Sequence, residues 1–541
     1  MHLKISYFCG SIFNNKFTVI VNTLLCLAVL CSIAYLNDIY SLKIKYIFFT
    51  SIATLFLSIF GNRFLFAIFS LFVILLALAE SHFIRVYGFH FQLISEQILT
   101  VILDSSNHEI FSYLKIISFK EYTILCISVL LCFLSLFTKK IEILYKKLIK
   151  LNTPFVNAFG NIIFSLLLVF LGTFDGIPKI YKKIIQESSI YSTSNPLRAN
   201  NLIQKKLFKW NCKASDNSPQ NVILIIGESH RRDYFFEAWD RLEPLNYEYR
   251  FSNMISQYAY TLRAIPQILS RKPLNYAVDE FYEPSLFKLF EEAGYKTHYI
   301  GYQPVNWEGD GAINYYVSET QNYYQFLDNK NKNSKIPVDD IEVLPIIKKI
   351  VDNNKKNFIV VKLIGVHYNF EDRYYKEDDI IKPSLYDNKV ETKKENRHFF
   401  INTYINAMNY STSVIHKIFE FVDTIHSPTI ISFISDHGIN IFDDGNWNIG
   451  SSKKAFEIPF IIKSNYEYIS TRNLTKWNNL KLHIDEPLIS NDLFETIVSL
   501  SEIDTKNIYN YDLTSKMKKN RKKREISFSS NKSVFIEDLN Y

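Results

Sequence analysis

The stretch VILIIGESH, residues 222–230, decides how the second half of this chain folds. Val222–Gly227 is an uninterrupted apolar run, rich in β-branched side chains. Such a run is typical of a strand buried on both faces of a parallel sheet. It ends at Glu228, whose carboxylate directly follows the last apolar residue. The stretch therefore predicts a buried strand with a polar, ligand-competent side chain at its carboxyl end.

The same kind of run recurs further along the chain. We expect more buried strands at Thr297–Tyr302, Phe358–Ile364 and Thr429–Ser435. Apolar residues at helical spacing predict helices at Pro284–Ala293, Ile341–Val351, Phe399–Val422 and Asp492–Leu500. Alternating strands and helices predict an α/β domain with a largely parallel sheet covered on both faces. Ligands bind such sheets beyond the carboxyl ends of the strands.

Two of the predicted strands end in side chains that can bind a metal ion. Glu228 follows the first strand, and Asp436 and His437 follow Thr429–Ser435. Two carboxylates and an imidazole form a mixed oxygen and nitrogen set that suits zinc, with manganese as the harder alternative. Each motif alone is weak, because a strand-end glutamate is often only solvated and Asp-His-Gly can be a plain turn. Together they predict a metal site.

A nucleophile is offered by the stretch QYAYTLRAIP, residues 257–266. Thr261 stands just before a predicted short helix that runs through Leu269. Backbone N–H groups and the helix dipole favour a phosphate at such a position. Metal coordination would lower the hydroxyl pKa and make it an alkoxide-like nucleophile. The simpler alternative is that Thr261 only caps the helix.

The chain before about Phe174 has the composition of a membrane domain. Lysines crowd the stretch Lys139–Lys150, which predicts a cytoplasmic loop, and the loop 80–121 then lies outside together with everything after Phe174. Five apolar segments approach the length of a membrane-spanning helix, at roughly Phe17–Leu36, Tyr46–Gly61, Arg63–Ala79, Tyr122–Thr138 and Ala158–Phe174.

Three regions follow from this division. We expect a five-helix transmembrane domain at 1–175, an interfacial helix with a linker at 176–220, and a periplasmic α/β domain at 221–541. Ile177–Ile185 has the amphipathic spacing of a helix lying in the membrane interface, although a plain connector resting on lipid fits as well. The net charge of +7 forms no basic stripe through the α/β domain, which argues against nucleic-acid binding.

Taken together, these features resemble the phosphoethanolamine transferases of the alkaline phosphatase and sulfatase superfamily, over nearly the whole chain. VILIIGESHRRDYF (222–235) resembles the first metal-ligand motif of that family, which implies that Glu228 is a ligand. ISFISDHG (431–438) resembles the second motif, which implies that Asp436 and His437 bind the same metal. The segment around Thr261 resembles the nucleophile motif, whose threonine is also a ligand.

Two further segments resemble parts of the family more loosely. IGVHYNF (364–370) resembles the motif whose histidine contacts the transferred phosphate, here His367. DSSNHEIFSYL (104–114) resembles a segment that helps to bind the lipid donor, which points to Asn107 and Glu109. A helix cap is the simpler explanation for the second segment.

The resemblance implies a complete reaction. An enzyme of the cell inner membrane, with its catalytic domain in the periplasm, would take phosphoethanolamine from the membrane lipid phosphatidylethanolamine. Thr261 would attack the phosphorus and carry the group as a phospho-threonine, with zinc as the expected metal. His367 and helix N–H groups would stabilise the charge of the transferred group. Lipopolysaccharide, at a core sugar or at lipid A, would be the acceptor.

The chain departs from the family in ways that leave alternatives open. Family members carry another histidine after the DHG motif, whereas INIFDDGNWNIGSSKK (439–454) contains none. Glu495 stands where relatives often have histidine. A second metal is therefore in question. A phosphoglycerol transferase of the same superfamily and a non-catalytic scaffold or sensor remain as alternatives. A true sulfatase is disfavoured, since no C/S-x-P-x-R motif lies near Thr261.

Overall fold

The computed structural model describes residues 207–539, with gaps at 275–282, 303–315, 326–338, 354, 391, 446, 449–451, 473, 506–511, 518–520 and 530–531. The predicted membrane spans, the interfacial helix, Asn107 and Glu109 lie outside these residues. Within the described part of the chain, no helix combines the length and hydrophobicity that crossing a bilayer requires.

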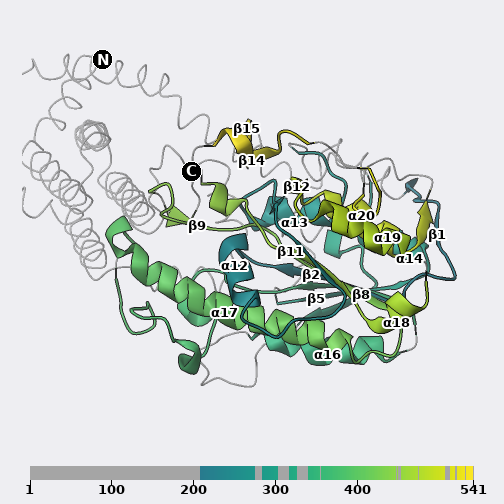
Figure 1. The fold of residues 1–541 in the computed structure, drawn as a ribbon, viewed down its shortest axis with the longest axis horizontal. Helices are drawn as coiled ribbons and strands as arrows, with labels where there is room; N and C mark the ends of the chain where they lie inside the picture. Colours follow the sequence, from purple (N-terminus) through teal and green to yellow (C-terminus); the bar gives the residue numbers. More distant parts are fainter. Residues whose placement is uncertain are drawn as a thin grey trace, which may run out of the picture. The chain divides into compact units, whose positions relative to one another are not determined.

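A seven-stranded sheet forms the centre of the domain (Figure 1). Five neighbouring strands, β8, β2, β7, β5 and β6, run parallel, while β11 runs antiparallel to both of its neighbours, β8 and β3. In spatial order the strands are β3 (Glu248–Phe251), β11 (Phe460–Ser464), β8 (Thr429–Ser435), β2 (Asn221–Gly227), β7 (Asn357–Lys362), β5 (Lys296–Gly301) and β6 (Asn322–Gln325). The prediction of an α/β fold with a largely parallel sheet is thus confirmed.

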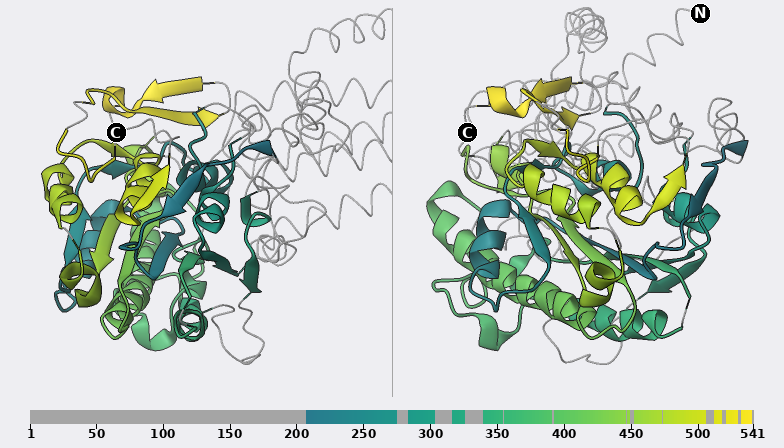
Figure 2. Two further views of the ribbon diagram at one scale, coloured as in Figure 1. Left: turned by 90° about the vertical axis from the view of Figure 1, so that its right-hand side faces the viewer. Right: turned by 45° about the vertical axis from the view of Figure 1, so that its right-hand side comes forward.

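Helices cover both faces of this sheet (Figures 1 and 2). One face carries α12 (Arg232–Trp239), α16 (Val343–Val351) and α17 (Arg397–Val422). The other carries α13 (Thr261–Leu269), α14 (Leu286–Glu292), α19 (Thr475–Asn479) and α20 (Asp492–Leu500). Beside them, α18 (Tyr466–Ser470) follows β11.

The alternation of side chains along β2 explains the two layers. Leu224 and Ile226 belong to the large core that also contains Phe290 of α14 and Ile497 of α20. On the opposite face Phe433 of β8 stacks on a phenylalanine of α12 with ring centroids 4.8 Å apart. Because successive strand residues point to opposite faces, a strand that is apolar throughout must be buried on both sides.

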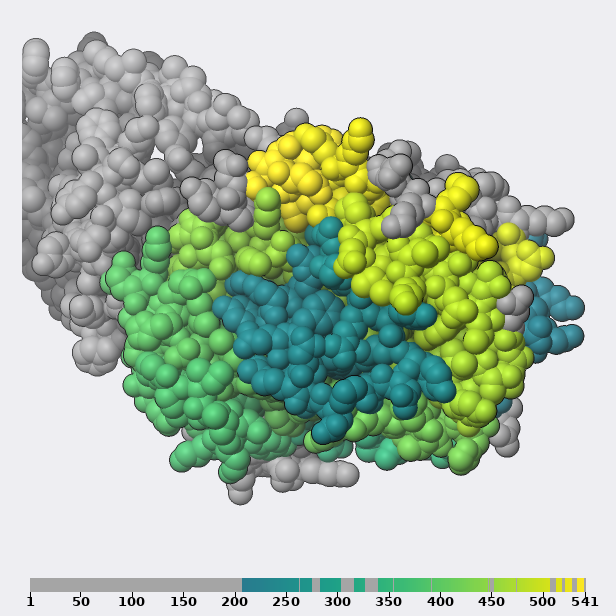
Figure 3. Space-filling view, in the orientation of Figure 1, coloured from purple at the N-terminus to yellow at the C-terminus, as the bar shows by residue number. Residues whose placement is uncertain are grey.

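Short strand pairs complete the domain. They are β1 (Cys212–Ala214) with β13 (Ile503–Thr505), β4 (Met254–Ile255) with β12 (Leu488–Ile489), β9 (Asn440–Ile441) with β10 (Trp447–Asn448), and β14 (Glu525–Ser529) with β15 (Lys532–Phe535). The last pair forms a C-terminal hairpin on the surface, drawn in yellow in Figure 3. Because β1 pairs with β13, residues from the end of the expected linker are part of the domain.

The 3-10 helices are single turns within connecting segments. They are η3 (Asp340–Glu342), η4 (Phe370–Asp372), η5 (Lys376–Asp378), η6 (Lys394–Asn396), η7 (Lys453–Ala455), η8 (Leu480–His483) and η9 (Ile536–Asp538).

Candidate metal centre and nucleophile

Glu228 and Asp436 lie side by side because the strands before them are in register. β2 and β8 are parallel neighbours, and Gly227 is paired with Ser435, so the next residue of each strand lies at the same level. The backbone N–H of Asp436 donates to the Gly227 carbonyl at 3.1 Å. A β-carbon at Gly227 would lie 2.7 Å from the His230 ring, so the close approach requires glycine.

These two carboxylates and His437 form a compact, buried group. One ligand atom from each lies within 4.8 Å of the others, and the three residues are 5%, 0% and 7% exposed. His437 Nδ1 lies 2.6 Å from the Gly438 carbonyl, so Nδ1 carries the proton and donates it there. His437 Nε2 then faces Glu228 Oε1 at 3.4 Å. A neutral imidazole held in this tautomer is the usual form of a metal ligand.

Thr261 completes the group from a third element. It is the first residue of α13, the helix predicted to run through Leu269. Its hydroxyl donates to Glu228 Oε2 at 3.0 Å and lies 3.2 Å from His437 Nε2. The structure therefore brings together the four residues predicted as metal ligands, with the hydroxyl at the amino end of a helix. A set of two carboxylates, an imidazole and a hydroxyl fits a divalent metal ion.

Lys362, the last residue of β7, also enters this group. Its ammonium donates to Glu228 Oε2 at 2.7 Å and to Asp436 Oδ2 at 3.3 Å. The side chain is 12% exposed. Lys362 is not among the site residues predicted from the sequence, although a lysine after the apolar run FIVV is a signal that could have found it. A charge in an otherwise buried strand needs a partner of opposite charge.

The charges of the group shift one another's protonation. Burial would raise the pKa of Glu228, but the Lys362 ammonium and a bond from His437 outweigh it and hold that pKa well below its usual range. Burial and the charge of Glu228 raise the pKa of Asp436. Burial lowers the pKa of His437, yet Asp436 and Glu228 prevail and raise it to about 9. Strongly perturbed groups gathered at one place are typical of a functional site.

His367 lies in the turn that follows β7. The turn is fixed by Asp340, which accepts the N–H groups of Ile364 at 2.9 Å and Gly365 at 2.7 Å. Gly365 has a φ of +53°. Within the described ranges, no hydrogen bond or ion pair joins His367 to the candidate metal group, but His367 contributes to lowering the pKa of Glu228. His367 is therefore near the group without a hydrogen bond or ion pair to it.

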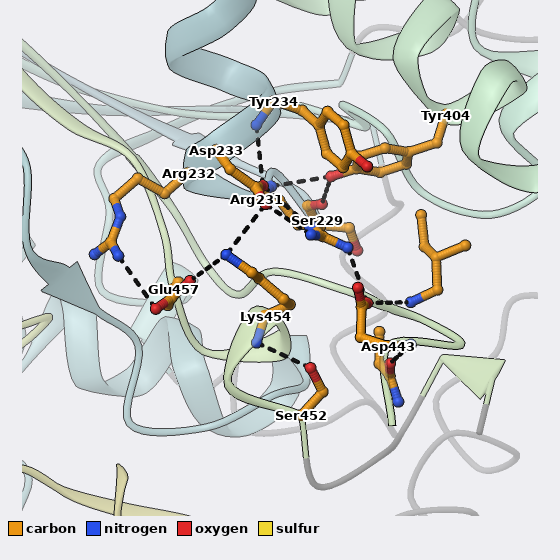
Figure 4. A network of polar contacts seen from close by, with 12 residues as sticks. Ser229, Arg231, Arg232, Asp233, Tyr234, Tyr404, Asp443, Ser452, Lys454 and Glu457 are labelled. Atoms are coloured by element: carbon orange, nitrogen blue, oxygen red, sulfur yellow. Dashed lines mark hydrogen bonds and ion pairs between the residues drawn. The ribbon is translucent and has the colours of Figure 1, made fainter. Parts of the chain in front are cut away.

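The loops beside the group are tied together by ion pairs (Figure 4). Arg231, 3% exposed, pairs with Asp233 at 2.7 Å and with Asp443 at 2.9 Å. Arg397 reaches the other oxygen of Asp443 at 2.9 Å. Lys454 joins Asp233 at 3.2 Å. The stretch 439–454, in which the family resemblance leads us to expect a further histidine, therefore supplies a carboxylate and an ammonium that hold the loops in place.

Two further residues at which the chain departs from the expected family pattern, Trp447 and Glu495, are buried in the domain. Trp447 is fully buried and packs on Phe400 with ring centroids 4.7 Å apart. Glu495 is buried in α20 and pairs with Arg271 at 3.2 Å. Burial raises the pKa of Glu495 to about 7, although Arg271 opposes that shift. Both residues stabilise the domain core.

Comparisons with known proteins agree with this architecture. The family model described as Sulfatase matches residues 220–503. Phosphoethanolamine transferase EptC of Escherichia coli (strain K12) is 23% identical over 284 residues, covering 48% of this chain and 47% of that protein. The chain thus spans about half the length of the curated relatives it matches.

Two solved structures share the fold. One is the C-terminal periplasmic domain of EcEptC from Escherichia coli in complex with Zn, with a TM-score of 0.51, 19% identity, and coverage of 61% of this chain and 96% of that one. The other is the integral membrane protein lipooligosaccharide phosphoethanolamine transferase A (EptA) from Neisseria meningitidis, with a TM-score of 0.56, 14% identity, and coverage of 92% and 96%. Because the family model covers more than half of its residues, the chain belongs to the sulfatase family.

Proposed function

We propose that this chain transfers phosphoethanolamine from phosphatidylethanolamine to lipopolysaccharide, through a covalent phospho-threonine at Thr261. The observation that carries the proposal is the position of the Thr261 hydroxyl, 3.0 Å from Glu228 and 3.2 Å from His437 at the start of α13. The names of the similar proteins support phosphoethanolamine as the transferred group.

Zinc is the metal that we propose for the site. Glu228, Asp436, His437 and Thr261 would hold it, and manganese is the second choice for this donor set. A bound zinc ion would supply Lewis-acid chemistry, lowering the pKa of the hydroxyl and offsetting charge on the phosphoryl oxygens. The Zn complex of the similar EcEptC domain supports this choice.

The residues of the chain prepare the nucleophile for an in-line attack. Glu228 accepts the hydroxyl proton of Thr261 in a hydrogen bond and so fixes the direction of the oxygen lone pairs. The amino end of α13 offers backbone N–H groups to the incoming phosphate. His367, near the group, would contact the same phosphate. Positioning and charge stabilisation are the main contributions an enzyme makes to phosphoryl transfer.

Two displacements at phosphorus make up the proposed reaction. In the first, a bond forms between Thr261 Oγ1 and phosphorus while the bond from phosphorus to the diacylglycerol oxygen breaks, and that oxygen takes up the proton that Thr261 loses. In the second, an acceptor hydroxyl or phosphate oxygen attacks the same phosphorus, the bond to Thr261 breaks, and a proton returns to Thr261 Oγ1. The group is thus carried by the protein between its two substrates.

The location that we propose follows the substrates. A lipid donor stays in the bilayer, so a multi-pass inner-membrane anchor would keep a periplasmic site near it, with Asn107 and Glu109 near the donor. The convergence of Glu228, Thr261, Asp436 and His437 argues against a non-catalytic scaffold. A phosphoglycerol transferase would use the same group, and the names of the relatives favour phosphoethanolamine over it.

The test is mass spectrometry of the purified full-length protein after incubation with phosphatidylethanolamine and zinc. We expect a phosphoethanolamine adduct on the peptide that contains Thr261. Thr261→Ala removes the attacking oxygen and lowers the transfer rate by at least about 1000-fold, whereas Thr261→Ser keeps a hydroxyl and retains part of the activity. An unchanged adduct in Thr261→Ala would refute the nucleophile assignment. A parallel incubation with phosphatidylglycerol tests the other transferase, because a glycerol phosphate adduct formed there, without a phosphoethanolamine adduct from phosphatidylethanolamine, would favour it.

A further inference from the structure

We propose that the ammonium of Lys362 is the second cation of this site, so that the protein works with one divalent ion and Lys362 instead of two divalent ions. This inference rests on the proposed function only in assuming that the group binds a divalent metal. It assigns a role to a residue that no motif marks.

The contacts of Lys362 place a fixed positive charge between the two acidic groups. The ammonium lies 2.7 Å from Glu228 Oε2, the oxygen that also accepts the Thr261 hydroxyl, and 3.3 Å from Asp436 Oδ2. It donates a further bond to the Gly227 carbonyl at 3.3 Å. The carboxylate side chains are 6% and 0% exposed. Water therefore screens this charge poorly, and its effect on nearby ions is large.

The charge balance favours one metal ion. Glu228 and Asp436 carry two negative charges, which a single divalent ion neutralises. The Lys362 ammonium then leaves the group with one net positive charge. That charge matches the single negative charge of a phosphodiester such as the donor headgroup. Buried charges are tolerated only when they are compensated in this way.

The surroundings offer little to a second metal ion. Within the described residues, the group of side chains arranged to hold a metal ion is Glu228, Asp436 and His437. It would already be taken by the first ion. Asp443, an acidic residue of the stretch 439–454, has its two oxygens bound by Arg231 and Arg397. Lys362 therefore occupies the place next to both carboxylates that a second ion would need in a two-metal site.

The experiment measures zinc binding to purified, metal-stripped, full-length protein by calorimetry, with the bound zinc counted by mass spectrometry. We expect one zinc per chain in the wild type. Lys362→Gln removes a positive charge close to the bound ion, so the zinc Kd falls by at least about tenfold, while transfer at saturating zinc becomes slower. A lysine that only holds the strand ends together would give the opposite change, a higher Kd, because its loss would disturb the ligands.

Two control variants separate charge from folding. Lys463→Gln removes another buried lysine, in β11, whose side chain is 0% exposed and pairs with Asp423. Lys463 is paired with Ile431 near the start of β8, at the opposite end from Asp436. This variant should lower the melting temperature without changing the zinc Kd. Lys362→Arg keeps the charge and should keep the zinc Kd close to the wild-type value.

The outcomes also separate this inference from the proposed function. Zinc binding needs neither donor nor acceptor. Suppose that the wild type binds one zinc per chain, that Lys362→Gln binds zinc more tightly, and that the wild type transfers nothing. This result would refute the proposed transferase function and leave the role of Lys362 intact. Two zinc ions per wild-type chain, weaker binding in Lys362→Gln, or a Kd for Lys362→Arg that follows the Gln variant would each overturn the inference.

Discussion

His437 is the residue at which the proposed metal ion and a proton would compete. Asp436 and Glu228 outweigh burial and raise the pKa of its imidazole to about 9. Without metal the ring therefore carries a proton on Nε2 at pH 7, since Nδ1 already donates to Gly438. A metal must displace that Nε2 proton to bind. His230, buried beside the group, has its pKa lowered to about 3 and contributes no proton in this range.

We therefore predict that the apparent zinc affinity increases as the pH rises from 6 to about 9 and levels off above it. Calorimetric titrations at pH 7 in two buffers of different ionisation enthalpy should show about one proton released per zinc bound. Zinc affinity that stays constant between pH 6 and 9 would show that the imidazole is neutral before the metal arrives.

At the residue scale the sequence predicts which side chains gather at the candidate site, but not the partners of those side chains. Glu228, Asp436 and His437 could be found because they stand just after strongly apolar strands. Thr261 could be found only with the help of a family resemblance, because a threonine at a helix start is usually a cap. Lys362 was missed because its partners are more than 70 residues away along the chain, and only strand order brings them together.

Asp340 shows how a whole turn depends on one side chain. It is buried at the start of η3 and accepts the N–H groups of Ile364 and Gly365, in the turn that leads to His367. Burial raises its pKa to about 6, against the effect of these two bonds. The element that carries His367 is therefore held from the segment before α16.

We predict that Asp340→Asn lowers the stability of the domain by about 1–3 kcal/mol and slows formation of the Thr261 adduct. The amide nitrogen replaces one accepting oxygen and faces an N–H group that it cannot satisfy. The neighbouring Asp339→Asn is the matched control, because Asp339 accepts the hydroxyls of Tyr375 and Tyr410 and the N–H of Ile341, but neither N–H group of the turn at 364–365. Chemical unfolding and adduct kinetics measure both effects. Equal adduct rates in the two variants would contradict a positioning role for Asp340.

At the element scale the central strands were predictable and two edge strands were not. β2, β7 and β8 are apolar over most of their length, which is the signature of burial on both faces. β5 has the sequence KTHYIG and is buried at every position after Lys296. β3 and β6 have four residues each, are mostly half-buried, and read EYRF and NYYQ. Neither shows a clear apolar period, because an edge strand has less surface to bury.

The C-terminal hairpin shows how the last residues of the chain support the site. The N–H of Ser527 donates to the Gln257 carbonyl at 2.9 Å, four residues before Thr261. The Gln257 amide returns a bond to the Glu525 carbonyl at 3.1 Å. Ile526 packs in a small core with Ile255. The sequence could not predict this contact, since Lys516–Arg524 reads as a solvated basic run and the hairpin contacts residues about 270 positions earlier.

Arg524 attaches this hairpin to the rest of the domain. Its loss should therefore loosen the segment that carries Thr261, the proposed nucleophile. Its guanidinium donates to the Asn253 carbonyl at 2.8 Å and to Glu537 at 2.7 Å, and its side chain is 9% exposed. We predict that Arg524→Ala lowers the free energy of unfolding by about 1–3 kcal/mol, because the Asn253 carbonyl loses one of its two donors and Glu537 loses its charged partner. It should also increase hydrogen exchange at residues 254–261.

The adjacent Lys523 is a matched control for this prediction. It pairs with Asp538 at the surface, where both side chains are about half exposed, and Lys523→Ala should change stability by less than about 0.5 kcal/mol. Hydrogen exchange followed by mass spectrometry reads the nucleophile segment directly. The contrary outcome is that Arg524→Ala loosens only the hairpin and leaves residues 254–261 protected. In that case the core alone stabilises the segment that carries Thr261, and the C-terminal hairpin does not contribute to the site.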